Sequence, residues 1–170
     1  MSKKVERNYL EIKSLDDLHV AKSPSDFFSI VIVDPADFQI NKFFYKNIGK
    51  PHRWVDRLVW SENQWISYTS AKNVETYILK RNNELAGYFE LIFHKETNDT
   101  EIAYLGLLDE YKYKKLGSYL LSSAIKNAFR KESKRVWVHT CSLDHKNALK
   151  NYLSRGMKIY NTETISVKSA

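Results

Sequence analysis

The chain has 170 residues, of which 43% are hydrophobic and 14% aromatic, and its formal net charge at pH 7 is +7. This length fits one compact domain, and the composition excludes a disordered chain. The longest nearly apolar run, residues 27–33, is much shorter than the roughly 18 residues that a membrane-spanning helix needs.

The cysteine content and the distribution of charge bear on the cellular compartment and on possible binding partners. Cys141 is the only cysteine, so no internal disulfide can form, and the charged N-terminus lacks the apolar core of a signal peptide. Both features favour the cytoplasm. The basic residues are spread along the chain, which a solvated surface explains, and no recognition-helix or RNA-binding pattern argues for nucleic acid. The histidines and the cysteine show no metal-ligand spacing, so no metal is expected.

The first half of the chain predicts two strands, at residues 9–13 and 28–33, and two helices, at residues 35–49 and about 61–68. Asp34 and Pro35 fit an N-cap and a first helical position, and Gly49 fits the end of that helix. Ser61 and Gln64 have the spacing of a capping box for the second helix.

The second half begins with three predicted strands, at residues 74–80, 84–94 and 101–107. Turn residues at 82–83 and 97–99 separate them, which predicts antiparallel hairpins. From Gly117, apolar or small residues recur with the period of a helix of three to four turns.

Residues 135–140 predict a further strand, which should run parallel to residues 101–107 because a helix connects the two. Asp144 fits the N-cap of a last helix that Gly156 would close. Residues 157–167 predict one or two final strands.

Two segments carry a family resemblance. Residues 112–117, Lys-Tyr-Lys-Lys-Leu-Gly, resemble the phosphate loop Arg/Gln-x-x-Gly-x-Gly/Ala of the GNAT acetyltransferase superfamily. Residues 137–156 resemble its fifth strand and fourth helix, and the likeness, to a bacterial subgroup, covers about residues 28–160. Lys115 replaces the first motif glycine, which is acceptable only if that position does not need a positive φ.

The resemblance implies an α/β fold with a mixed, mostly antiparallel sheet of six to seven strands and about four flanking helices. One such domain would span residues 1–170, with its core at about 28–160. Acetyl-CoA would lie in a V-shaped gap between two splayed parallel strands. Gly106 fits a bulge beside that gap, and a simple packing requirement explains it equally well.

By resemblance, backbone amides of the loop and of the following helix start would hold the pyrophosphate, where basic residues and the helix dipole favour anions. The amide of Leu105 would face the thioester carbonyl. The residues implied for coenzyme binding are Leu105, Leu107, Lys112, Tyr113, Lys114, Lys115, Leu116, Gly117, Ser118, His145 and Ala148.

Two residues are implied as catalytic. Tyr152 falls where many members keep the tyrosine that protonates the leaving thiolate, and the register of Ala148, Tyr152 and Gly156 favours this over a core tyrosine bonded to backbone. Glu101 falls where some members deprotonate the amine, directly or through water. A solvated strand-end glutamate is the alternative for Glu101, and both interpretations stay open.

By resemblance, the segment at residues 51–60, which lies between the first two predicted helices, would shape the pocket for the acceptor amine. The candidates are Trp54, Asp56, Arg57, Glu90, Tyr104 and His139. Aromatic faces with Asp56 and Arg57 suit a small zwitterion, and an aromatic mini-core with a surface ion pair is the alternative.

The sequence therefore predicts a monomeric or homodimeric N-acetyltransferase that moves an acetyl group from acetyl-CoA to a primary amine of a small molecule or peptide. Two other functions stay open: a non-catalytic acyl-CoA-binding module, and a ribosome- or RNA-associated protein acetyltransferase.

Overall fold

A computed structural model describes residues 1–112 and 115–168 of the chain. Within these residues, one sheet holds seven strands in the order β2-β3-β4-β5-β6-β1-β7. The strands are β1 (Ser2–Ile12), β2 (Phe28–Ile32), β3 (Val74–Arg81), β4 (Glu84–His94), β5 (Asp99–Leu107), β6 (Arg135–Cys141) and β7 (Lys158–Lys168). The predicted hairpins of β3, β4 and β5 are confirmed, and so is the parallel pair, β5 with β6.

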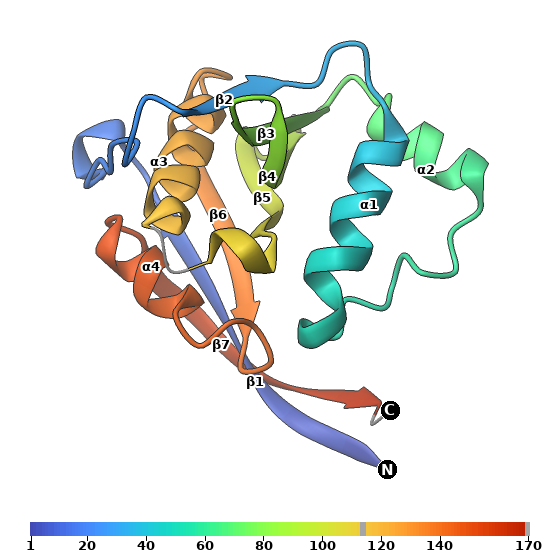
Figure 1. Cartoon of the computed structure of the whole chain (residues 1–170). Helices are drawn as coiled ribbons and strands as arrows, with labels where there is room; N and C mark the ends of the chain where they lie inside the picture. The colour runs from blue at the N-terminus through green and yellow to red at the C-terminus, as the bar shows by residue number, and fades with distance from the viewer. Residues whose placement is uncertain (113–114, 169–170) are drawn as a thin grey trace.

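Helices cover both faces of the sheet. The α-helices of the described residues are α1 (Phe38–Gly49), α2 (Glu62–Thr69), α3 (Leu116–Phe129) and α4 (Ala148–Ser154). Single 3-10 turns are η1 (Leu15–Asp17), η2 (Lys50–His52) and η3 (Asp109–Tyr111). Figure 1 shows α3 and α4 on one side of the sheet and α1 and α2 on the other. The expected α/β class, with a mixed sheet of six to seven strands and about four flanking helices, is confirmed.

Each face of the sheet has its own apolar core. The apolar face of α3, with Leu120, Leu121 and Ile125 fully buried, packs on the central strands and forms the larger core. On the other face, Phe44 and Ile48 of α1 pack against Ile78 and Tyr88 of the sheet. Burial of these side chains is the main stabilising contribution to the layered structure.

Strand β1 is longer than the five residues predicted and occupies an inner position. It pairs antiparallel with β6 on one edge and with β7 on the other. Leu10 and Ile12 are buried in the main core, which explains why only this part of the strand shows a clear apolar pattern. The outer ends of β1 and β7 project together beyond the helices, with both termini at the tip (Figure 1).

The predicted start of α1 is wrong by three residues. Asp37 is the N-cap, and its carboxylate accepts a hydrogen bond from the Gln39 amide at 3.0 Å. Asp34 and Pro35 lie in the connection that follows β2. The capping box of α2 is confirmed, because Ser61 and Gln64 exchange both hydrogen bonds.

The predicted cap of α4 is also wrong. Asn147 occupies the N-cap position, whereas the Asp144 carboxylate accepts hydrogen bonds from the Thr140 hydroxyl and the Cys141 amide and so holds the turn after β6. Gly156 does follow the helix end, with a φ of 103°. A Cβ there would lie 2.1 Å from the Asp17 carbonyl oxygen, so both backbone conformation and space require glycine.

Candidate active site

The parallel strands β5 and β6 separate soon after they begin to pair. Along the described parts of both strands, register pairs link only Asp99 with Arg135, Thr100 with Val136, and Glu101 with Trp137. Beyond these pairs the strands diverge, and a cavity of about 1270 Å³ opens between them. Glu101 lines the cavity at its narrow end. The expected splayed pair is therefore present.

A bulge in β5 determines which of its side chains face α1 and which face α3. Glu90 pairs with Tyr104 but Leu91 pairs with Ile102, so Ala103 is the extra residue. Ile102 and Leu105 consequently both pack in the core under α3, and Tyr104 packs on the α1 side with Trp54. The bulge is thus not at Gly106.

Gly106 serves close packing instead. It pairs with Tyr88 in the regular part of the β4–β5 ladder. A Cβ added to Gly106 would lie 2.6 Å from Cγ2 of Ile48 on α1. The packing interpretation of this glycine is therefore the correct one.

The amides of Leu105 and Leu107 point into the gap. The Leu108 amide donates to the Ala86 carbonyl at 2.8 Å, on the β4 side. Successive amides of a strand alternate between its two edges, so those of Leu105 and Leu107 face β6, where the described ladder has already ended. Both residues line the cavity.

The wide end of the cavity carries the basic loop. Lys112, Lys115, Gly117 and Ser118 line it, whereas the Leu116 side chain is buried in the main core. Lys112 lies 2.8 Å from Asp109, and this contact lowers the pKa of the Asp109 carboxyl. Tyr113 and Lys114 fall outside the described residues.

Lys115 adopts the left-handed conformation that the sequence argument required it to avoid. Its φ is 59° and its ψ is 14°, at the N-cap position of α3, and its side chain makes no capping hydrogen bond. A non-glycine residue in this region is disfavoured by about 1 kcal/mol. The loop therefore keeps the glycine-like backbone of the family motif and exchanges glycine for an additional positive charge.

Tyr152 of α4 reaches the cavity from the β6 side. Its side chain is 8% exposed, and its hydroxyl makes no hydrogen bond with any residue that the structure describes. Burial, with a smaller contribution from Asp144, raises the pKa of Tyr152, so the hydroxyl keeps its proton. The side-chain amide of the neighbouring Asn151 donates to the Gly117 backbone carbonyl at 3.0 Å, and this hydrogen bond holds α4 against the start of α3.

The loop before α4 contacts the end of α1 beside the cavity. His145 and Ala148 line the cavity. The His145 ring lies 6.2 Å from the His52 ring, and Nδ1 of His52 is 3.1 Å from the Leu143 carbonyl oxygen. Burial, followed by the charges of Lys112 and His52, lowers the pKa of His145.

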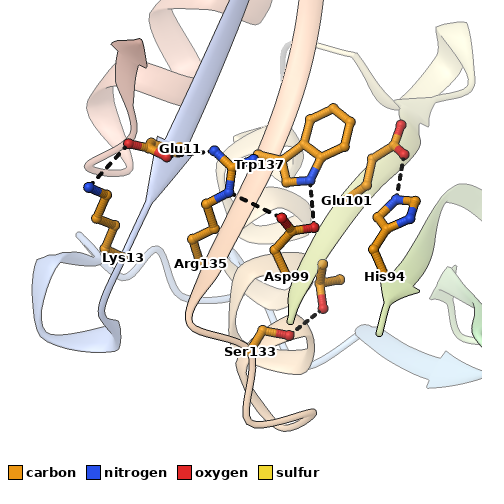
Figure 2. A network of polar contacts seen from close by, with 9 residues as sticks. Glu11, Lys13, His94, Asp99, Glu101, Ser133, Arg135 and Trp137 are labelled. Carbon is orange, nitrogen blue, oxygen red and sulfur yellow. Dashed lines mark hydrogen bonds and ion pairs between the residues drawn. The ribbon is translucent and has the colours of Figure 1, made fainter. Parts of the chain in front are cut away.

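Glu101 has a partner that sequence reasoning missed. Nε2 of His94 on β4 lies 3.0 Å from Oε1 of Glu101, and the two side chains face each other in Figure 2. Glu101 is therefore a cavity-lining carboxylate with one side-chain contact among the described residues, and it is not an isolated group in solvent. The turn at residues 95–98 places His94 near Glu101, so the hairpin register was the available signal.

The predicted acceptor residues divide into two groups. Those that line the cavity are Trp54, Asp56, Arg57, Tyr104 and His139. Partial desolvation of the His139 ring, followed by the charge of Arg7, lowers the pKa of His139. Glu90 is fully buried and does not line the cavity.

Glu90 and Arg57 bind each other. Nη1 of Arg57 lies 2.9 Å from Oε1 and 3.2 Å from Oε2 of Glu90. The Tyr68 hydroxyl donates to Oε1 at 2.6 Å and the Asn41 amide to Oε2 at 2.8 Å. With both oxygens occupied, Glu90 cannot bind a substrate cation, and that prediction is corrected.

Aromatic rings enclose the Arg57 guanidinium. Its central carbon lies 4.1 Å from the Tyr68 ring and 4.3 Å from the Tyr104 ring, with Trp60 at 4.8 Å. Burial alone would lower the pKa of Arg57, but Glu90 outweighs it and raises the pKa, so the charge is retained. The aromatic mini-core is present, but it surrounds the buried Arg57–Glu90 pair and not a surface ion pair, and it borders the cavity.

No group of three potential metal ligands occurs among the described residues. Within the same residues, no helix has the length and apolarity to cross a membrane.

Comparison with solved structures shows the same fold at low sequence identity. A GCN5-related N-acetyltransferase from Kribbella flavida matches with a TM-score of 0.69 at 14% identity, over 95% of this chain and 56% of that one. One from Sphaerobacter thermophilus matches with a TM-score of 0.70 at 12% identity, over 97% and 52%. This chain thus spans only about half the length of these relatives.

A shorter relative is matched over most of its length. An aminoglycoside acetyltransferase from an uncultured soil metagenomic sample, in complex with trehalose, gives a TM-score of 0.64 at 13% identity, over 78% of this chain and 90% of that one. A search of curated proteins found no match.

The family comparison covers the site itself. The model of the Acetyltransferase (GNAT) family matches residues 39–157, which include the bulged strand, the basic loop and Tyr152. The chain therefore belongs to the GNAT acetyltransferase family.

Proposed function

We propose that this chain transfers an acetyl group from acetyl-CoA to a primary amine of a small molecule, by direct attack in a ternary complex. The observation that carries the proposal is the gap between β5 and β6, with Glu101 at its narrow end and, on its wall, the Tyr152 hydroxyl, which has no hydrogen bond to the described residues. A carboxylate can accept a proton and a phenol can donate one, and acylation of an amine needs both steps.

The cavity fits acetyl-CoA. Its volume of about 1270 Å³ lies above the roughly 300–1,000 Å³ of ordinary ligand pockets, as an elongated coenzyme requires. Lys112 and Lys115 with the uncapped start of α3 would hold the pyrophosphate, and the amide of Leu107 would hold the pantetheine arm. When bound, acetyl-CoA supplies an activated thioester.

The chain's own residues then handle two protons and one developing charge. Glu101 accepts a proton from the ammonium form of the acceptor, so that the neutral nitrogen can attack the thioester carbon. The Leu105 amide stabilises negative charge on the carbonyl oxygen. The Tyr152 hydroxyl donates its proton to the departing sulfur as the carbon–sulfur bond breaks, and the second proton that the acylated nitrogen loses returns Tyr152 to its protonated form.

The acceptor would enter on the α1 side. Trp54 and Tyr104 offer aromatic faces to a cation, and the Asp56 carboxylate offers a charge. Arg57 contributes indirectly, because its ion pair with Glu90 ties the connection between α1 and α2 to β4. A cationic amine therefore suits this side better than the zwitterion predicted from the sequence.

A thiol-release assay tests the function. Purified protein with acetyl-CoA is screened against polyamines, amino acids, aminoglycosides and N-terminal peptides, and we expect release of coenzyme A that depends on a small amine. Acetyl-CoA in the absence of amine is the control. Thermal stabilisation by acetyl-CoA without amine-dependent release from any acceptor would instead identify a binding module.

A further inference from the structure

We propose that His94 is a positioning residue for Glu101. Its Nε2–H would donate to Oε1 of Glu101 and so leave Oε2, which has no hydrogen bond among the described residues, to take the proton of the acceptor amine. This inference rests on the proposed function, in which Glu101 is the base. It assigns a role to a residue that the family motifs do not include.

The backbone brings the two side chains together. Glu101 pairs with Ile92 and Asp99 pairs with His94, so His94 and Glu101 are diagonal neighbours on one face of the β4–β5 hairpin. The bulge at Ala103 lies just beyond Glu101. The contact therefore sits in the last regular part of the ladder, before the strand turns its side chains toward the acceptor.

A fixed indole holds the imidazole in place. The His94 ring stacks on Trp137 of β6, with 6.0 Å between centroids and 23° between planes. The indole N–H donates to Oδ1 of Asp99 at 3.0 Å, and Nε of Arg135 donates to Oδ2 at 3.3 Å. Figure 2 shows this chain of contacts from Arg135 to Glu101. A platform of this kind limits rotation of the imidazole ring.

The charged side chains near the His94–Glu101 pair are themselves paired with opposite charges. On the β6 side Arg135 faces Asp99 and Glu11. Burial opposes ionisation of Asp99, but hydrogen bonds led by Trp137 lower its pKa, so it stays charged. His139 lies on the cavity side, and its lowered pKa favours the neutral form. Among the described residues, His94 is thus the donor in hydrogen-bond contact with Glu101.

Exposure separates the two members of the pair. The His94 side chain is 35% exposed and the Glu101 side chain 17%. The carboxylate is therefore the less exposed of the two groups.

The first experiment uses the free protein. Nitrogen-15 NMR of histidine-labelled protein, with the His94 signals assigned by their loss in His94→Gln, reports which ring nitrogen carries the proton. We expect protonated Nε2, with a signal that moves in Glu101→Gln. A bare Nε2 with the proton on Nδ1 would overturn the inference, whether or not the protein has activity.

The second experiment uses the acetyl transfer reaction. His94→Phe keeps a ring on Trp137 but removes the donor, and we expect kcat to fall about tenfold with an unchanged KM for acetyl-CoA. His94→Gln restores an N–H, so we expect it to recover most of the loss. In the Glu101→Gln background, His94→Phe should cause no further decrease.

The matched control is His19→Phe. This exposed histidine contacts the Ser154 carbonyl, away from the cavity, and its replacement should leave kcat unchanged. Full activity of His94→Phe, or losses that multiply with Glu101→Gln, would overturn the positioning role. Absence of thiol release in every variant would reject the proposed function alone, since the NMR result still decides the tautomer.

Discussion

Two glutamates on neighbouring strands show how differently one side chain can be used. Glu90 on β4 is fully buried, and Arg57, Tyr68 and Asn41 occupy both of its oxygens. Glu101 on β5 lines the cavity and contacts only His94 among the described side chains. Both were plausible substrate or base residues from the sequence. The two carboxylates thus differ in how many of their oxygens are already hydrogen-bonded to the described residues.

The largest expected effect comes from unbalancing the Glu90 site. Glu90→Gln leaves the buried Arg57 without a counter-charge, and we expect a loss of about 3–5 kcal/mol in the free energy of unfolding, measured by urea denaturation. The control is Glu75→Gln, which breaks the Glu75–Lys131 pair at 2.7 Å. That pair is solvent-accessible, so its loss should cost about 1 kcal/mol or less.

A double variant sharpens the same test. Arg57→Met with Glu90→Met removes both charges, and we expect it to recover much of the stability lost in Glu90→Gln. Equal stability of Glu90→Gln and Glu75→Gln would show that the buried ion pair is not a structural requirement.

Two tyrosines extend the comparison to hydroxyl groups. The Tyr68 hydroxyl is bonded to Glu90, whereas that of Tyr152 has no hydrogen bond to the described residues. Tyr152→Phe should lower kcat about tenfold or more, with little change in unfolding free energy or acetyl-CoA affinity. Tyr68→Phe should show the reverse, a stability loss of about 1–2 kcal/mol with kcat less affected.

Turnover kinetics and urea denaturation of both variants distinguish a proton donor from a structural tyrosine. Wild-type turnover by Tyr152→Phe would remove this residue from the mechanism. A large stability loss in the same variant would identify a core tyrosine instead of a proton donor.

The smallest effect concerns the phosphate loop. Lys115→Gly relieves the positive φ of 59°, and we expect a gain of about 0.5–1 kcal/mol in stability. The same change removes a charge from the cavity, so the Kd for acetyl-CoA should rise. Lys115→Gln, which loses the charge but keeps the strained backbone, separates the two contributions. A stability loss in Lys115→Gly would contradict the strain argument.

Local patterns predicted the hairpins and the main helix well. Asn82 and Asn98 adopt positive φ in the two turns, which asparagine tolerates better than most residues. These turn residues made the pairing of β3, β4 and β5 predictable from the sequence. The helical spacing of the apolar residues in α3 likewise predicted which face of this helix is buried. Each of these features depends on residues close together in the chain.

Features that depend on distant residues were not predictable in this way. The bulge falls at Ala103 because packing on both faces requires it, and no glycine marks the position. The contact of Arg57 with Glu90 joins an irregular connection to a strand 33 positions away. The cavity-lining residues were largely found because the family motif, more than the local pattern, pointed to them.

The inner position of β1 has a consequence for how the protein reaches its folded state. Residues 2–12 pair only with strands formed by residues 135–168 along the described chain. Nearly the whole polypeptide must be in place before this strand finds a neighbour, and such long-range closure slows folding. Until then its apolar side chains, including Leu10, are available to the wrong partners, which makes the earliest stretch of the sequence the one most exposed to misassembly.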